Sequence, residues 1–251
     1  MPYQLTVSPD FTPDHISGWY IFNTWLQRTW GENIHLELYN NFNSQRAAIE
    51  SDKIDLIYAN PFDAAILVRE KRFLPVAKPI HTSDEALIAV CKESPIHHVE
   101  DLPERVSIAT TDDPDVNLMC AMMLEPAEIT PDNADRQIKD NYPLVAKTVL
   151  QGQAELGFFL HEAFYSLSGI TRNRLRPLVT SQIQIIHHTL LIGPRLASKR
   201  KKVCDLLINM PQLSKGAGVL ISLGIDGWAA VDDEEMEFMI DLMDTLNYLP
   251  A

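Results

Sequence analysis

The chain has 251 residues, of which 46% are hydrophobic and 22% charged, a composition typical of soluble globular proteins with a substantial core. Its formal net charge of −13 argues against non-specific binding to nucleic acid or to an anionic membrane surface. No apolar run approaches the roughly 18 residues that a membrane-spanning helix requires.

Strands and helices alternate along the first third of the chain. Strands are predicted at residues 4–7, 34–39, 54–59 and 73–80, and helices at residues 14–30, 44–50 and 62–72. The helix at 14–30 has the clearest pattern, because its aromatic and aliphatic side chains recur with helical spacing. Such alternation of strands with helices predicts parallel or mixed sheets.

The stretch from residue 40 to residue 61 is the most informative part of this pattern. Ser44 is expected to cap its short helix, because a serine hydroxyl accepts a hydrogen bond from a free amide of the first turn. Residues 54–59 are mostly apolar, as in a strand that is covered on both faces. Asn60 and Pro61 then end the strand. Open α/β sheets place their ligands at strand ends of this kind.

The rest of the chain continues in the same manner. Strands are predicted at residues 85–91, 106–110, 136–139, 156–160, 175–180 and 183–192, and helices at residues 115–124, 142–151, 198–210 and 232–248. The two long apolar segments at 85–91 and 183–192 are expected to carry the chain between two α/β lobes. Asp232 or Asp233 is expected to cap the last helix.

The stretch at 40–61, with Val99-Glu100-Asp101-Leu102 further on, resembles substrate-binding proteins of phosphonate and phosphite ABC transporters. The similarity runs from Leu5 to about Met210. It implies a type II periplasmic-binding-protein fold, with two α/β lobes of mixed sheets joined by a two-stranded hinge. Lobe one is expected to comprise residues 1–84 and 190–251, and lobe two residues 85–189.

The resemblance also implies a function. It predicts a solute-binding protein that closes its two lobes over a small polar ligand, such as an oxyanion or a phosphonate, and delivers it to the membrane component of an ABC transporter. The implied protein is a periplasmic monomer that does not bind nucleic acid. The N-terminus carries no basic region and no apolar signal core. A cytoplasmic ligand sensor, or a cofactor-biosynthesis enzyme on the same fold, is therefore the alternative hypothesis.

Four elements face the ligand in the resembled family, and they assign candidate contacts to this chain. The implied ligand-binding residues are Ser8, Asp10, Phe11, Tyr58, Asn60, His81, Thr110, Thr111, Asp112, His161 and Glu162. Asn60 is the foremost candidate, because its amide can both donate and accept hydrogen bonds. For Tyr58, the interpretation that competes with ligand contact is a place in the core. For Glu162, it is a solvated position in a loop.

The chain departs from the family at residues 110–117, where a Ser/Thr-rich turn usually holds the oxyanion at a helix N-terminus. Asp112, Asp113 and Asp115 crowd this turn and would repel a phosphonate if they faced it. Aspartates at a helix start are also ordinary capping residues. If the acids do contact the ligand, a cationic group, a neutral polar ligand or a metal-bridged anion would suit them better.

No sequence motif points to chemistry. The chain has no HExxH, GxSxG, P-loop or GxGxxG motif and no paired Cys/His spacing. We therefore predict no catalytic residue, no cofactor and no metal site. The three cysteines, Cys91, Cys120 and Cys204, are expected to be buried free thiols.

Overall fold

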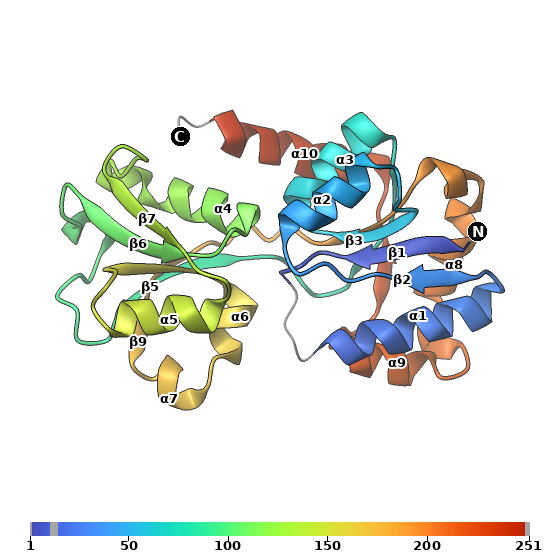
Figure 1. Cartoon of the computed structure of the whole chain (residues 1–251), viewed down its shortest axis with the longest axis horizontal. Coiled ribbons are helices and arrows are strands. Elements are labelled where there is room, and N and C mark those ends of the chain that lie inside the picture. Colours follow the sequence, from blue (N-terminus) through green and yellow to red (C-terminus); the bar gives the residue numbers. More distant parts are fainter. Residues whose placement is uncertain (1, 11–14, 249–251) are drawn as a thin grey trace. The chain divides into compact units, whose positions relative to one another are not determined.

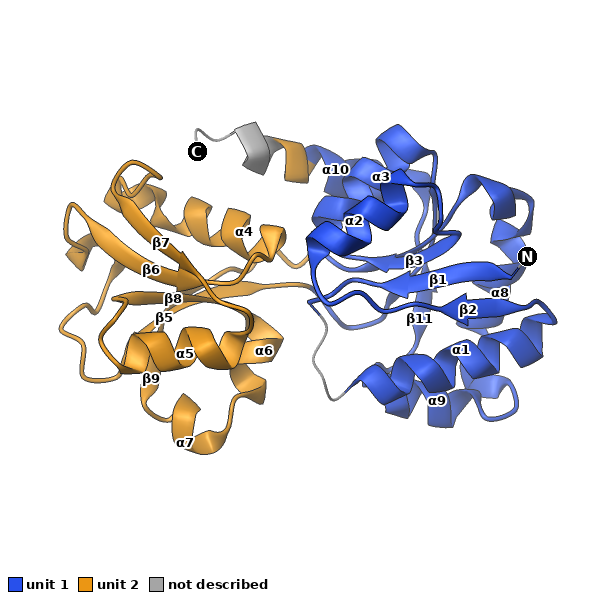
Figure 2. Ribbon diagram, viewed as in Figure 1, with its two compact units in different colours: residues 1–83, 187–241 blue, residues 84–186, 242–251 orange. Residues whose placement is uncertain are grey.

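The computed structural model describes residues 2–10 and 15–248 and divides into two compact units (Figures 1 and 2). Unit 1 takes residues 1–83 and 187–241, and unit 2 takes residues 84–186 and 242–251. The chain passes from one unit to the other after Ser83, after Ile186 and, within its last helix, after Asp241.

Unit 1 contains a six-stranded mixed sheet with the order β11-β4-β10-β3-β1-β2. Its strands are β1 (Tyr3–Val7), β2 (Ile34–Leu36), β3 (Leu56–Ala59), β4 (Leu74–Pro79), β10 (Thr189–Ile192) and β11 (Trp228–Ala230). Its helices are α1 (Ile16–Trp30), α2 (Phe42–Glu50), α3 (Pro61–Lys71), α8 (Arg200–Ile208), α9 (Gly216–Leu223) and most of α10 (Asp233–Tyr248). Strand β1 runs parallel to β2 and β3, whereas β10 is antiparallel to β3 and β4.

The core of unit 1 is built largely by α1. Trp19, Phe22 and Leu26 follow one another at helical spacing and are buried in the same cluster as Leu5 and Val7 of β1. Burial of such side chains stabilises the fold by roughly 1.5–3 kcal/mol each. Of the side chains predicted to form the apolar face of this helix, Trp19, Phe22, Trp25, Leu26 and Trp30 are buried, whereas Ile16 and Tyr20 are exposed.

Helices α1 and α9 lie side by side in Figure 1, and Gly18 makes their close approach possible. A Cβ atom at Gly18 would lie 2.0 Å from the carbonyl oxygen of Ser222. We expect Gly18→Ala to lower the free energy of unfolding by about 2 kcal/mol, because the helix backbones must separate. Gly218→Ala on α9 is the matched control, since its Cβ would meet nothing within 4 Å. It should instead stabilise the protein by up to about 1 kcal/mol, and urea unfolding of both variants measures the contrast.

Unit 2 contains a five-stranded mixed sheet with the order β7-β6-β8-β5-β9. Its strands are β5 (Ala86–Cys91), β6 (Val106–Thr110), β7 (Ala134–Ile138), β8 (Leu156–Leu160) and β9 (Leu175–Thr180). Its helices are α4 (Pro114–Leu124), α5 (Tyr142–Leu150), α6 (His161–Ser166) and α7 (Gly169–Arg172). Strand β6 runs parallel to β7 and β8, and β5 is antiparallel to β8 and β9.

Several predicted boundaries were wrong for local reasons. Asn41, not Ser44, caps α2, because its side-chain oxygen accepts a hydrogen bond from the Ser44 amide at 2.9 Å. Helix α6 begins directly at His161, where a loop was predicted. Helix α9 and strand β11 were not predicted. The cysteines are free as predicted, but only Cys120 is buried, and Cys91 and Cys204 are partly exposed.

The strand predicted at 183–192 is only four residues long, and Glu85 explains why. Its carboxylate accepts hydrogen bonds from the amides of Ile183 at 3.1 Å and Gln184 at 2.7 Å, and from the Ser181 hydroxyl. The amides of Ile183 and Gln184 consequently do not form hydrogen bonds with a neighbouring strand. Gln184 also adopts a left-handed conformation with φ of 63°, so the extended chain begins again only at β10.

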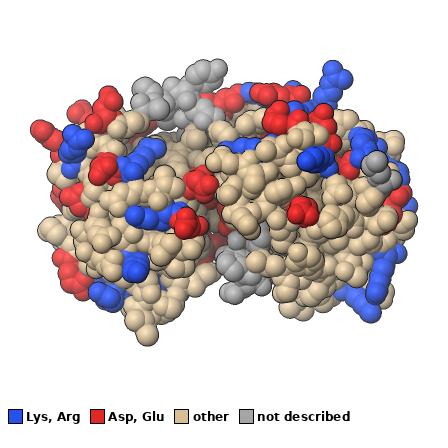
Figure 3. Space-filling view, viewed as in Figure 1, with Lys and Arg blue, Asp and Glu red and all other residues tan. Residues whose placement is uncertain are grey.

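Within residues 2–10 and 15–248, we find no helix that combines the length and the apolar character needed to span a lipid bilayer. On the face shown in Figure 3, acidic and basic side chains of the described residues are interspersed over both units without a broad basic area.

Candidate functional site

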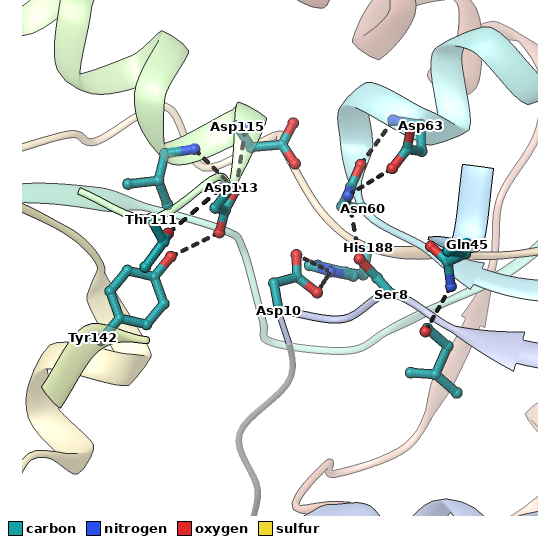
Figure 4. Close-up of polar contacts among 12 residues, drawn as sticks. Ser8, Asp10, Gln45, Asn60, Asp63, Thr111, Asp113, Asp115, Tyr142 and His188 are labelled. Atoms are coloured by element: carbon teal, nitrogen blue, oxygen red, sulfur yellow. Dashed lines mark hydrogen bonds and ion pairs between the residues drawn. The ribbon is translucent and has the colours of Figure 1, made fainter. Parts of the chain in front are cut away.

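The polar residues of unit 1 gather where β1 and β3 end beside each other. Ser8 follows β1, and its backbone amide donates to the carbonyl oxygen of Tyr58 at 2.8 Å. Asn60 follows β3, and its side-chain amide donates to the Ser8 hydroxyl oxygen at 3.2 Å (Figure 4). Gln45 fixes the end of β1 by donating to the Val7 carbonyl oxygen at 2.7 Å. Parallel pairing of β1 with β3 is what brings these distant residues together.

Asn60 is built into the fold of unit 1. Its side-chain oxygen accepts a hydrogen bond from the Asp63 amide at 2.7 Å and so caps helix α3. Its NH₂ group donates to Ser8 and, at 3.1 Å, to the Asp63 carboxylate. Asn60 has no exposed surface. The foremost candidate for a ligand contact is thus also a capping residue, and its contact with a ligand stays a prediction.

A bidentate ion pair holds the Asp63 carboxylate in place. The Nε and Nη2 atoms of Arg46 donate to the two carboxylate oxygens at 2.7 and 3.1 Å. The guanidinium also lies 5.3 Å from the ring centroids of both Phe42 and Phe62. Bidentate pairing fixes the orientation as well as the position of a carboxylate. Arg46 therefore orients Asp63, and Asp63 in turn orients Asn60.

Asp10 and His188 form the charged part of this cluster. His188 Nε2 lies 3.0 and 3.2 Å from the Asp10 carboxylate oxygens, and its ring stacks on Tyr58 with centroids 5.1 Å apart. The Asp10 side chain is 2% exposed. Burial alone would raise the pKa of Asp10, but the charge and hydrogen bond of His188, together with the Ser8 hydroxyl, lower it below its ordinary value. Asp10 is therefore ionised at neutral pH.

The depressed pKa of Asp10 predicts a pH-dependent contribution to stability. A carboxylate whose pKa is lower in the folded state stabilises the protein above its unfolded pKa of about 3.9, and this stabilisation is lost as the pH falls through the folded pKa. We expect Asp10→Asn to cost about 1.5–3 kcal/mol at neutral pH, the usual contribution of hydrogen bonds to a charged group. Urea unfolding at several pH values should show the difference shrinking as acid protonates Asp10 in the wild type. A difference that is constant with pH would contradict this role for the carboxylate.

In unit 2, Asp113 occupies the N-terminus of α4. One of its carboxylate oxygens accepts hydrogen bonds from the amides of Asp115 at 3.1 Å and Val116 at 3.3 Å. The other oxygen accepts from the hydroxyl of Tyr142 at 2.7 Å (Figure 4). Asp113 is 2% exposed. Of the two roles considered for these acids, the structure confirms capping for Asp113.

The two predicted threonines support the same turn. The Thr110 hydroxyl donates to the Asn117 side-chain oxygen at 2.7 Å, and the Asn117 NH₂ group donates to the Thr111 carbonyl oxygen at 2.9 Å. The Thr111 hydroxyl oxygen accepts from the Asp113 amide at 3.4 Å. Asp112 is exposed. Hydrogen bonds within the turn consequently use both threonines, and their contact with a ligand stays a prediction.

Three other predicted site residues, His81, His161 and Glu162, lie apart from the groups around Asn60 and Asp113. Among the described residues, we find no contact that joins them to either group. His81 lies in an exposed turn with φ of 59°, and its partner is Asp226 at 3.3 Å. His161 and Glu162 are exposed in the first turn of α6, where the His161 ring packs on Tyr165 with centroids 4.6 Å apart. Phe11 lies outside the described residues.

The structure adds residues that the sequence did not single out. Arg46 and Asp63 lie on α2 and α3, so no local motif joins them. Tyr142 follows β7 and begins α5, a position comparable to that of the other strand-end candidates. The structure places His188 against Asp10, and it places His187 Nε2 3.6 Å from Glu235 of α10.

Comparison with known proteins relates the fold to one family. A family model described as the periplasmic substrate-binding protein of the phosphonate ABC transporter matches residues 5–236. A comparison with curated protein sequences finds no significant match. These findings confirm the resemblance seen in the sequence. They do not favour the alternative of a cytoplasmic sensor or biosynthetic enzyme.

Solved structures of binding proteins share the fold at low identity. PhnD1 from Prochlorococcus marinus, solved in complex with methylphosphonate, has a TM-score of 0.81 at 11% identity, with 98% of each chain covered. A binding protein component of an ABC phosphonate transporter from Pseudomonas aeruginosa has a TM-score of 0.76 at 16% identity, covering 99% of this chain and 89% of its own. An ancestral arginine-binding protein bound to arginine has a TM-score of 0.62 at 12% identity, covering 88% and 97%. The predicted type II periplasmic-binding-protein fold is thereby confirmed.

Proposed function

This chain belongs to the family of periplasmic substrate-binding proteins of phosphonate ABC transporters, and on that premise we propose that it binds a small polar solute at the strand ends described above and delivers it to the membrane component of an ABC transporter. We further propose that it acts as a monomer in the periplasm, the compartment named for the family. Solute binding is the role of the family, whereas the solute of this chain has to be inferred from its side chains.

The observation that carries the proposal is the hydrogen-bonded cluster at the ends of β1 and β3. Ser8, Asp10, Tyr58 and His188 combine a hydroxyl, an ionised carboxylate, an aromatic ring and an imidazole within one connected set. A rigid set of such groups at strand ends can orient a small polar molecule through a few hydrogen bonds. No chemical step is needed to explain it.

The side chains favour a solute with a hydrogen-bond donor or a cationic group. The acceptor groups of this cluster in unit 1 include the Asp10 carboxylate, which is ionised at neutral pH. Proteins of this fold hold solutes of opposite charge. Whether a protein of this fold binds an anionic or a cationic solute therefore depends on the charged side chains at its site and not on the fold.

A thermal-shift screen of the purified protein tests this function. The panel contains phosphate, phosphite, methylphosphonate, sulfate, amino acids and polyamines. A solute at a hundred times its Kd stabilises the folded state by about 2.7 kcal/mol, which should raise Tm by roughly 5–10 °C in a protein of this size. We expect at least one solute to do so and to be recovered unchanged. A panel without any shift, or a solute that is consumed, would overturn the proposal.

A further inference from the structure

Unit 2 has a cavity in its surface that shares no residue with the hydrogen-bonded clusters described above. Its volume of about 380 Å³ falls within the range of roughly 300–1,000 Å³ that is typical of small-molecule sites. The residues that line it are Pro143, Lys147, Leu150, Gln151, Thr171 and Arg174. The proposed solute site uses none of them, so it leaves the cavity without a role.

Helix α5 forms one wall of the cavity. Pro143, Lys147 and Gln151 follow one another at intervals of four residues, which places them in a row along one face of the helix. The Gln151 amide donates to the Lys147 carbonyl oxygen at 3.0 Å, so the row continues to the end of α5. Lys147 and Gln151 are exposed, whereas Leu150 is half-buried. This wall therefore presents a cation and an amide next to apolar surface.

Helix α7 and the residues before β9 form the other wall. The Ser168 hydroxyl oxygen accepts a hydrogen bond from the Thr171 amide at 3.3 Å and so caps α7. The Arg174 amide donates to the Thr171 carbonyl oxygen at 3.1 Å, and the Arg174 carbonyl oxygen accepts from the Lys92 amide at 2.9 Å. Lys92 directly follows β5. The backbone that carries Thr171 and Arg174 is therefore fixed to the sheet before any ligand binds.

The charge of the cavity is opposite in sign to that of the whole chain. The chain has 34 acidic and 21 basic residues, yet Lys147 and Arg174 are the charged residues that line the cavity. Neither of them forms an ion pair or a side-chain hydrogen bond with any residue that the structure describes. Glu93 is near enough to interact with the charge of Arg174, but it accepts a hydrogen bond from the Cys91 thiol at 3.0 Å and is not a lining residue. The cavity consequently favours an anion.

The neighbouring Arg172 provides a contrast to Arg174. The Arg172 guanidinium donates to the Tyr165 carbonyl oxygen and lies 5.9 Å from the centroid of the Tyr165 ring. Arg172 is therefore engaged by α6 within the same unit, whereas Arg174 is exposed at the cavity. Of these two arginines, Arg174 is the one that can bind a molecule from solution.

We propose that this cavity is a second binding site, which takes a small organic anion whose phosphate or carboxylate group lies between Lys147 and Arg174. A guanidinium donates two parallel hydrogen bonds to such a group, and a lysine ammonium adds a point charge. The Gln151 amide and the Thr171 hydroxyl offer further polar contacts, and the apolar lining residues cover the rest of the molecule. The site goes beyond the proposed function, because solute delivery requires none of these residues.

An NMR titration of the isotope-labelled protein with phenyl phosphate, benzoate and benzamide tests the site. Benzamide is the neutral counterpart of benzoate and has nearly the same shape. We expect both anions to shift the backbone amide signals of α7 and of the last turn of α5. Benzamide should bind there at least about ten-fold more weakly, because it cannot form charge-assisted hydrogen bonds.

Three variants identify the side chains that bind the anion. Arg174→Gln should raise the Kd for phenyl phosphate by at least about ten-fold, because it removes the bidentate donor. Lys147→Gln should raise it less, by about three-fold, since the carbonyl groups at the end of α5 partly offset the charge of this lysine. Arg105→Gln is the matched control, because Arg105 is exposed in the same unit but does not line the cavity. It should change the Kd less than about two-fold, since salt screens distant charges.

Several results would overturn the inference. One is the absence of shifts in α5 and α7 with both anions at millimolar concentration, and another is equal binding of benzoate and benzamide. An equal loss of affinity in Arg174→Gln and Arg105→Gln would show that only the overall charge matters. Arg174→Gln should also keep the wild-type thermal shift with the solute bound at the strand ends of unit 1, and loss of that shift would show that the cavity is not a separate site.

Discussion

Replacing Arg46 with methionine should lower the free energy of unfolding by about 3–4 kcal/mol, because it leaves the Asp63 carboxylate buried without its cation. The Asp63 side chain is 4% exposed, and Arg46 donates two hydrogen bonds to it. Methionine keeps much of the packing against Phe42 and Phe62, so the loss reports mainly the charge. Urea unfolding monitored by circular dichroism measures the change.

A second substitution identifies the buried charge as the cause. In the double variant Arg46→Met/Asp63→Asn, the unpaired carboxylate is removed, and most of the lost stability should return. Arg69→Met is the control, because its ion pair with Asp241 is exposed on both sides and should contribute less than about 1 kcal/mol. Equal losses in Arg46→Met and Arg69→Met would contradict the role given to Asp63.

Asn60→Ala should cost about 3 kcal/mol. It removes the cap of α3, worth about 1 kcal/mol, and also removes a donor from the buried Asp63 carboxylate and from Ser8. Asn141→Ala is the matched control, since Asn141 caps α5 through one exposed hydrogen bond at 3.0 Å to the Leu144 amide. It should cost only about 1 kcal/mol.

The comparison of Asn60→Ala with Asn141→Ala separates capping from the wider network. A similar loss in both variants would mean that the contacts of Asn60 with Ser8 and Asp63 add nothing to stability. The expected excess of about 2 kcal/mol would mean that Asn60 holds the strand-end cluster together. Binding measurements on Asn60→Ala then have to be made well below its unfolding temperature.

Local sequence patterns were sufficient for much of the fold. Strands β6, β8 and β9 begin and end at the predicted residues, because each is a run of β-compatible side chains bounded by polar residues, glycine or proline. Strand β10 was predicted too long, since the hydrogen bonds of Glu85 to Ile183 and Gln184 join residues about 100 positions apart. Apolar periodicity does not carry such information.

The site was harder to predict than the fold for a similar reason. Ser8, Asp10, Tyr58 and Asn60 were assigned as candidates from the family resemblance, and the parallel pairing of β1 with β3 aligns the strand ends on which they lie. The partners that orient them, Arg46, Asp63 and His188, come from other elements and carry no motif. The sequence also did not show whether Asp112 or Asp113 caps α4. The capping residue is the one whose backbone is extended directly before the helix, and in the structure that residue is Asp113.

Native mass spectrometry of the purified protein, mixed with each solute of the thermal-shift panel, is the most direct test of solute binding without chemistry. We expect a one-to-one complex with a neutral or cationic solute, and the mass of that solute should be the same before and after prolonged incubation. A complex with no member of the panel, or the release of a product of different mass, would contradict it.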